Sequence, residues 1–315
     1  MTEPTDDITG KRRASAADFD PEVLRLFDGY VHGRIDRRAF LDGAAKFAVG
    51  GLSAAALLEA LSPDFAAAEQ VPASDARITA RRVEFPSPQG YGSGRGYLVR
   101  PASAPPPGGA ATPTTGLPAV LVIHENRGLN PHIEDVARRL ALDNFIAFAP
   151  DALFPLGGYP GDEDKARELF GKLDMAKTRE DLLAAARYLH GIPGGNGKLG
   201  AIGFCWGGGM VNTLATRVPE LAAAAPFYGQ APASDSVAAI RAPLLLMFAD
   251  HDDFVNKGWP AYEAALKAAG KRFEAYRYPG TQHGFNNDTT PRYDAGAAAQ
   301  AWQRAVDFLN RNLRA

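Results

Sequence analysis

The chain has 315 residues, of which 46% are hydrophobic and 22% are charged. This composition is typical of a soluble globular protein with one sizeable core, and it excludes collagen-like, coiled-coil and wholly disordered chains. The 34 lysine and arginine residues nearly balance the 36 aspartate and glutamate residues, so the chain lacks the general basic surface that binds nucleic acid. The only cysteine, Cys205, excludes an internal disulfide and a site of several thiolates, and it is either a small buried hydrophobe or a reactive thiol.

Residues 1–70 form an N-terminal leader that is rich in alanine and acidic residues and shows no strand-like alternation. The pair Arg37-Arg38, just before Phe40-Leu41, resembles a twin-arginine export signal. It is followed by an uncharged run of twelve residues from Phe47 to Leu58 and then by the small residues 66–68. A run of this length is too short to span a bilayer, which needs about 20 apolar residues, so we expect no stable membrane insertion. It does fit the apolar core of a secretory signal, which has about 7–15 residues.

A second interpretation of the leader stays open. The arginine pair lies far from Met1 and follows an acidic rather than a basic region, which is unusual for an export signal. A helical extension that packs on the domain or on a partner fits the same residues. Export would place the protein in the periplasm, and the alternative would leave it in the cytoplasm.

Residues 75–315 alternate between short β-rich runs and helical patterns, which predicts an α/β domain with a mostly parallel central sheet of about eight strands flanked by helices. The first two runs have only a short loop between them, so we expect an antiparallel pair at the sheet edge. A surface loop is expected from Ala102 to Gly116, which is dense in Pro, Gly, Ala and Thr. The expected strands are 81–85, 95–100, 118–124, 145–149, 198–204, 223–228, 243–249 and 273–278. The expected helices are 131–142, 175–190, 206–217, 257–269 and 294–312.

Cys205 lies directly after one of these strands, in the sequence Gly203-Phe204-Cys205-Trp206-Gly207. This matches the nucleophile-elbow pattern G-x-S-x-G with cysteine in place of serine, because small residues two positions either side permit a sharp turn from strand to helix. A thiol at a helix N-terminus is favoured as thiolate, and the N–H groups there can stabilise an oxyanion. The alternative, that the glycines merely allow close packing around a buried cysteine, is weakened by the strand before and the helix after.

An acid and a histidine are expected further along the chain, in that order. The segment Asp250-His251-Asp252-Asp253 follows the strand 243–249, and His283 follows the strand 273–278. We favour Asp252 over Asp250 and Asp253 as the carboxylate, and His283 over His251 as the base, because His251 precedes the acid and lies in the same turn.

The remaining histidines are expected to play no catalytic part. His32 lies in the leader, His190 ends a helical pattern and His132 starts one, while His124 is interpreted as a packing residue. Glu125 follows the strand 118–124 and is either a solvated loop carboxylate paired with Arg127 or an acceptor for the thiol proton of Cys205.

Together these segments resemble the dienelactone hydrolase (carboxymethylenebutenolidase) family of the α/β-hydrolases, over about residues 80–312. The resemblance is carried by the combination of His124-Glu125-Asn126-Arg127-Gly128, Pro150-Asp151, Gly203-Phe204-Cys205-Trp206-Gly207-Gly208, Asp252-Asp253-Phe254-Val255 and His283-Gly284-Phe285.

The resemblance implies an α/β-hydrolase fold that opens a lactone ring or cleaves a small-molecule ester, without a metal or an organic cofactor. By this correspondence Cys205 is the nucleophile, His283 the base and Asp252 the carboxylate that orients it. Glu125 corresponds to the glutamate that interacts with the resting thiol, and the backbone N–H groups of Trp206 and Asn126 form the oxyanion hole.

One position departs from the family. Its members that act on dienelactone use arginines to hold the substrate carboxylate, one of them four residues after the histidine, where this chain has Asn287, with Arg292 further on. The natural substrate therefore stays open, and a general carboxylesterase or thioesterase with the same triad is an alternative. Two weaker alternatives are a non-catalytic binding module and a metal-binding protein that uses ligands from among His124, Glu125, His251, Asp252 and Asp253.

Overall fold

The structure is a computed structural model that describes residues 14–48, 53–102 and 116–314. Residues 49–52, inside the uncharged run from Phe47 to Leu58, and residues 103–115 of the expected surface loop lie outside the described residues. The chain divides into two compact units. The smaller unit takes residues 1–69, 249–251 and 278–301, and the larger unit takes 70–248, 252–277 and 302–315. The leader boundary predicted at residues 70–75 stays a prediction.

An eight-stranded sheet in the order β1-β2-β4-β3-β5-β6-β7-β8 forms the centre of the α/β fold. β1 and β2 pair antiparallel from Ile78↔Pro101 to Ser87↔Gly92, as expected for the edge pair. β2 also pairs antiparallel with β4, whereas β3, β4, β5, β6 and β7 pair in parallel. The strands are β1 (Ile78–Ser87), β2 (Gly92–Pro101), β3 (Leu117–Ile123), β4 (Ile146–Pro150), β5 (Gly195–Phe204), β6 (Leu221–Phe227), β7 (Leu244–His251) and β8 (Phe273–Gln282).

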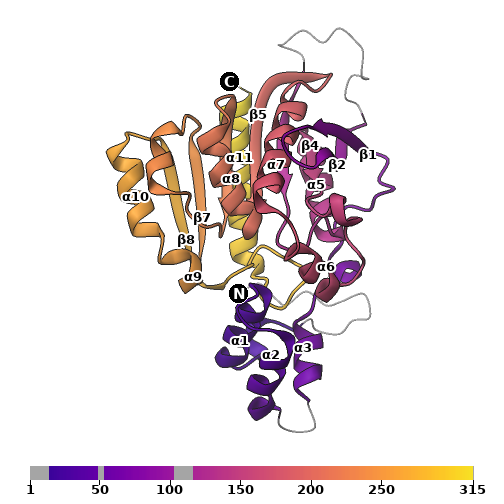
Figure 1. The fold of residues 1–315 in the computed structure, drawn as a ribbon, viewed down its shortest axis with the longest axis vertical. Coiled ribbons are helices and arrows are strands. Elements are labelled where there is room, and N and C mark those ends of the chain that lie inside the picture. The colour runs from indigo at the N-terminus through magenta and orange to yellow at the C-terminus, as the bar shows by residue number, and fades with distance from the viewer. Residues whose placement is uncertain (1–13, 49–52, 103–115, 315) are drawn as a thin grey trace. The chain divides into compact units, whose positions relative to one another are not determined.

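Helices cover both faces of this sheet (Figure 1). Residues of α7 and α8 share one apolar cluster with β-strand residues such as Leu121 and Ala201. Gly200 lies against Leu309 and Leu313 of α11, on the opposite face, because neighbouring strand residues point to opposite sides. The helices of this part are α5 (Pro131–Leu142), α6 (Glu163–Phe170), α7 (Met175–His190), α8 (Trp206–Arg217), α9 (Asp253–Asn256), α10 (Trp259–Ala268) and α11 (Ala295–Leu313), with 3-10 turns at Phe154–Leu156 and Ser234–Ala239.

All eight strands and five helices predicted from the sequence are confirmed, and α6 and α9 are additional. α6 was not predicted because only two of its residues, Ala166 and Phe170, are buried, so its sequence has little apolar periodicity. Its start is fixed by a side-chain cap, in which the Asp162 carboxylate accepts a hydrogen bond of 2.8 Å from the Lys165 N–H.

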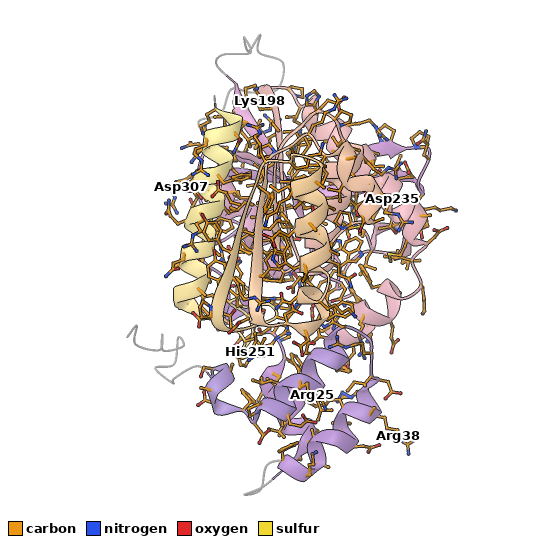
Figure 2. All side chains as sticks on the ribbon, turned by 90° about the vertical axis from the view of Figure 1, so that its left-hand side faces the viewer. Arg25, Arg38, Lys198, Asp235, His251 and Asp307 are labelled. Carbon is orange, nitrogen blue, oxygen red and sulfur yellow. The ribbon has the colours of Figure 1, made fainter. Side chains whose placement is uncertain are left out.

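The leader is helical, as predicted, and has a core of its own. It contains α1 (Pro21–Val31), α2 (Arg37–Ala44), α3 (Ala54–Leu61) and α4 (Phe65–Ala68), with 3-10 turns at Ala16–Asp18 and Ala45–Phe47. Phe40 is fully buried and contacts Phe27 and Tyr30, with ring centroids 6.2 and 5.8 Å away. The paired arginines lie at the exposed start of α2, where Arg38 extends away from the helix (Figure 2). In the described ranges, no helix has both the length and the apolar character to cross a membrane.

Candidate active site

Cys205 lies at the sharp turn between β5 and α8, with φ 55° and ψ −116°. Positive φ is costly for a residue with a side chain, so the turn must be held by its surroundings. Its N–H donates to the Phe227 carbonyl and its carbonyl accepts from the Gly209 N–H, each at 3.1 Å. The side chain is buried, with 7% of the residue exposed. This backbone is that of a nucleophile elbow, which holds its side chain above the sheet at a helix N-terminus.

Two glycines make the turn possible by allowing backbone to approach backbone. A Cβ on Gly203 would lie 2.4 Å from the Gly207 carbonyl oxygen, and a Cβ on Gly207 would lie 2.3 Å from the carbonyl oxygen of Ile123, the last residue of β3. The start of α8 is therefore pressed against the end of β3. The segment that follows β3, which contains Glu125 and Asn126, begins at this contact.

His124 packs beside the elbow. Its ring stacks on Trp206 with centroids 5.3 Å apart, and Trp206 meets Phe170 edge-on at 4.9 Å. The Ala152 N–H donates to Nε2 at 3.1 Å, and Nδ1 donates to the Glu125 carbonyl. Burial lowers the pKa of His124 to about 4, so the ring is neutral near pH 7. With both nitrogens engaged by the backbone, His124 supports the segment and has no lone pair left for a metal.

An ion pair between a buried arginine and a partly buried glutamate lies next to this segment and was not predicted. Arg127 Nε lies 3.5 Å from a carboxylate oxygen of Glu163, and the Tyr159 hydroxyl donates to Glu163 at 2.9 Å. Burial lowers the pKa of Arg127 and raises that of Glu163, since both charges leave water. The charge of Arg127 also acts on Glu125 and Cys205. Glu163 was not identified from the sequence because it lies in α6, a helix that was not predicted. Arg127, by contrast, belongs to the motif of residues 124–128.

Arg127 also fixes the residue before it. Its Nη1 donates to the side-chain oxygen of Asn126 at 2.7 Å and to the Asn126 carbonyl at 3.1 Å. Within the larger unit the structure thus brings together Cys205, Trp206 and the segment of residues 124–127.

Asp252 follows β7 and begins α9. Its Oδ1 accepts a hydrogen bond of 3.1 Å from the Val255 N–H, and the residue is buried. Its two neighbouring acids have other surroundings. Asp253 is exposed, and Asp250 joins β7 to the β8 turn by accepting from the Gly280 N–H at 3.0 Å. The preference for Asp252 stays a prediction, with burial in its favour.

His283 follows β8 and belongs to the smaller unit, where it meets a leader residue that the sequence analysis set aside. Its Nε2 lies 3.1 Å from Nε2 of His32, with ring centroids 4.3 Å apart and planes inclined by 74°. His32 in turn lies beside Asp28, one turn earlier, with 3.1 Å between Nδ1 and Oδ1. The contact was not predicted from sequence, because the two histidines lie 251 residues apart.

Asn287 and Arg292, the two residues discussed in connection with a substrate carboxylate, both contact other residues of the smaller unit. The side-chain oxygen of Asn287 accepts from the N–H and the hydroxyl of Thr289. The guanidinium of Arg292 is buried, lies 5.0 Å from the centre of the Phe27 ring and is 4.0 Å from Asp28. Both side chains therefore have structural contacts of their own.

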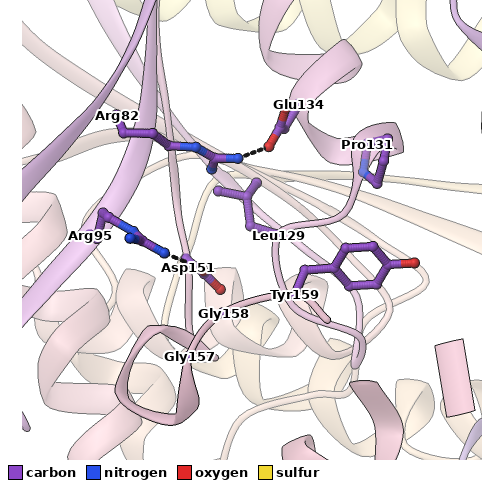
Figure 3. A pocket seen from close by; sticks show the side chains of 9 residues that line it. All are labelled: Arg82, Arg95, Leu129, Pro131, Glu134, Asp151, Gly157, Gly158 and Tyr159. Atoms are coloured by element: carbon purple, nitrogen blue, oxygen red, sulfur yellow. Dashed lines mark hydrogen bonds and ion pairs between the residues drawn. The ribbon is translucent and has the colours of Figure 1, made fainter. Parts of the chain in front are cut away.

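A cavity of about 240 Å³ lies in the larger unit, along the residues that follow β4 (Figure 3). Arg82 pairs with Glu134 in its wall, and Arg95 lies 4.0 Å from the buried Asp151. Tyr159 lines the cavity and also reaches Glu163, so the cavity adjoins the Arg127–Glu163 pair. Gly157, Gly158 and Tyr159, from the loop after β4, form part of the cavity wall.

Two family profiles match parts of the chain. Residues 107–313 match the profile of the dienelactone hydrolase family, and residues 11–47 match a second profile, described as YqhI-like. An Escherichia coli K12 protein, "Putative hydrolase fragment YghX", is 50% identical over 123 residues, which make up 39% of this chain and 97% of the fragment.

More complete relatives are less similar. A Saccharolobus solfataricus protein described as "Putative carboxymethylenebutenolidase" is 31% identical over 237 residues, which cover 64% of this chain and 92% of the relative. Among solved structures, the "Putative Dienelactone Hydrolase" from Klebsiella pneumoniae is 28% identical with a TM-score of 0.63, over 74% of this chain and 99% of that one.

Proposed function

We propose that this chain, which belongs to the dienelactone hydrolase family and is therefore a hydrolase of esters or lactones, works through a thioester on Cys205. The single observation that carries the proposal is the backbone of Cys205, a residue with a side chain at φ 55° between a strand and a helix. Such a conformation is retained where it serves a purpose, and at this point of an α/β-hydrolase its purpose is to present a nucleophile.

In the first step the thiolate of Cys205 attacks the carbonyl carbon. A C–S bond forms and the C–O bond to the leaving group breaks, and the departing oxygen takes a proton from His283. In the second step His283 removes a proton from water, the resulting hydroxide attacks the thioester, and the C–S bond breaks to release the acid and the thiolate. Asp252 orients His283 through both steps.

The surroundings of Cys205 support its activation. The N-terminus of α8 and the positive charge of Arg127 both favour thiolate over thiol. Glu125 interacts with the resting thiol and takes up its proton when substrate binds, which is the interpretation we prefer over a simple Glu125–Arg127 pair because Arg127 lies against Glu163. The Trp206 and Asn126 N–H groups receive the oxyanion, and one such donor typically contributes about 2.7–4 kcal/mol.

The proposal needs no metal and no organic cofactor. Full activity after exhaustive chelation is the expected result, and a loss that an added divalent cation restores would favour the metal-binding alternative.

The reaction is tested by replacing the nucleophile. Cys205→Ala should lower kcat/KM for an activated aryl ester by about a thousandfold or more, because the residual oxyanion donors cannot replace the covalent step. Mass spectrometry of acid-quenched wild-type reactions should find the acyl group on the peptide that contains Cys205. Folding of the variant is checked by circular dichroism, and Cys205→Ser is the matched control that keeps the volume and loses the thiolate. A Cys205→Ala enzyme with unchanged kcat/KM would refute the mechanism.

The substrate class separates the two enzymatic interpretations. We propose a lactone or an ester that resembles dienelactone, and a panel compares a carboxylate-bearing lactone with neutral aryl esters and acyl thioesters. A preference of at least tenfold for the lactone supports the proposal, whereas a preference for simple esters or thioesters assigns the general carboxylesterase or thioesterase function.

A further inference from the structure

His32 and His283, which both belong to the smaller unit, must share a proton. Nitrogen atoms 3.1 Å apart, such as Nε2 of His32 and Nε2 of His283, are at hydrogen-bond distance, and two lone pairs facing each other would repel. One of the two nitrogens therefore carries a hydrogen that points to the other.

The surroundings of His32 decide how that ring is protonated. Its Nδ1 faces two acceptors of Asp28, the carbonyl oxygen at 2.8 Å and the carboxylate Oδ1 at 3.1 Å, so Nδ1 carries a hydrogen. Neutral His32 then presents the lone pair of Nε2 to His283 and accepts its Nε2–H. The shared hydrogen then lies on Nε2 of His283.

Asp28 supplies the negative charge behind the pair. Burial by itself would raise the pKa of its carboxyl, but the hydrogen bond with His32 and the positive charges of His283, His32 and Arg292 hold the pKa well below its usual range. Arg34 also pairs with this carboxylate. Asp28 is thus ionised at every pH at which the histidines titrate, and it favours a positive charge on the two rings.

We propose that Asp28 and His32 are a positioning pair for His283, in which His32 accepts the Nε2–H of His283 and stabilises its imidazolium form. This inference rests on the proposed function, since it assigns a role relative to the base of that reaction. Among the described residues of the smaller unit, Asp28 lies against His32, and Arg34 and Arg292 lie against the Asp28 carboxylate. In the proposed mechanism Asp252 and Cys205 are further partners of His283.

The pair then affects the two steps of the reaction in opposite ways. In the first step the imidazolium form of His283 lies beside the thiolate and protonates the leaving group. His32 stabilises this form, so it favours the first step. The second step needs neutral His283, and a stabilised imidazolium postpones that form to higher pH. Removing His32 should therefore extend hydrolysis of the thioester to more acidic conditions.

The test follows kcat between pH 4.5 and 9 with an ester whose thioester accumulates, so that kcat reports the second step. His32→Ala should move the acid limb of the profile to lower pH by about one unit, a tenfold change in proton concentration. His32→Gln should restore much of the wild-type position, because its amide oxygen can accept the same hydrogen bond. Asp28→Asn should move the limb in the same direction as His32→Ala. Arg25→Ala is the control on the same helix, since Arg25 is exposed and, among the described residues, pairs with Glu22, and it should leave the limb in place.

A second readout is independent of turnover. In the Cys205→Ala background, ring-nitrogen NMR should show His283 titrating at a lower pH after His32→Ala. An unchanged titration and an unchanged acid limb would overturn the inference while leaving the proposed function intact. If Cys205→Ala retains its kcat/KM, the proposed function fails, and the NMR titration still decides whether His32 acts on His283.

Discussion

His124 shows how one buried side chain can make the stability of the protein depend on pH. The ring is fully buried, stacks on Trp206 and is kept neutral by its surroundings, which lower its pKa to about 4. In the unfolded chain the same ring titrates near pH 6.5. Between these values protons bind the unfolded chain and not the folded one, so stability that is present above pH 6.5 is lost as the pH falls towards 4.

The predicted contribution of this ring is about 3 kcal/mol, from the difference between the two pKa values. Urea unfolding of wild type and His124→Gln from pH 7 to pH 4 measures it, because glutamine does not titrate and all other groups cancel in the comparison. The wild-type advantage should shrink by about 3 kcal/mol across this range. A difference that stays constant with pH would show that His124 is not held neutral.

The residues of the candidate site differ in how far sequence could predict them. Cys205 could be proposed because its signal is local, a glycine two positions before and after it. In the structure, Gly207 brings the start of α8 against the end of β3. His32 could not be proposed from the sequence, since no local pattern marks a residue whose partner is 251 positions away. Glu163 was hidden for a different reason, because a two-turn helix that buries two side chains has almost no periodic signal.

The turn between β5 and α8 is the element on which the candidate site depends, and its tolerance for a methyl group can be measured. Gly207→Ala places a Cβ 2.3 Å from the Ile123 carbonyl oxygen, so backbone must move, at a cost of about 1–3 kcal/mol. Gly209→Ala is the matched control in the same helix, where the nearest atom would be 3.5 Å away. Alanine there should stabilise the protein by about 0.5–1 kcal/mol. Urea unfolding of both variants gives the comparison, and equal effects would contradict the close approach of β3 and α8.

The elements themselves were largely predictable. The central strands are nearly continuous hydrophobic runs since both faces are covered, which separates them clearly from the amphipathic helices. The order of the strands within the sheet could not be predicted as well. β4 lies between β2 and β3 and pairs with one in each direction, and no residue pattern within β4 specifies its two neighbours.

Across the whole chain, the leader and a distant loop belong to one compact unit. Besides the His32–His283 contact, the Asp64 N–H donates to the Thr289 carbonyl at 2.8 Å, and Arg292 lies against Phe27. The sequence gives no hint of this association, because the loop after β8 reads as part of the hydrolase domain. The leader part of this unit has an apolar core that includes the fully buried Phe40 and also Phe27, the ring that Arg292 contacts.

Loosening that core should therefore loosen the loop. Phe40→Ala is expected to cost about 3–5 kcal/mol in local stability, the usual range for a buried phenylalanine. Hydrogen exchange followed by mass spectrometry should accelerate in residues 284–292 as well as in α1 and α2, while α7 keeps its protection. Arg25→Ala, on the exposed face of α1, is the control and should change neither region. Unchanged exchange in the loop would mean that leader and loop open independently.

Arg37-Arg38 lies five residues after His32, so the candidate export signal and the positioning pair belong to the same segment of the leader. If these arginines direct export and a peptidase cuts near residues 66–68, the fragment that leaves takes Asp28 and His32 with it. Proteolysis would then be a one-way adjustment of the enzyme, which would lose a neighbour of its base on maturation and work best in more acidic surroundings afterwards. The mass of the protein recovered from its native host tells directly which of the two forms is at work.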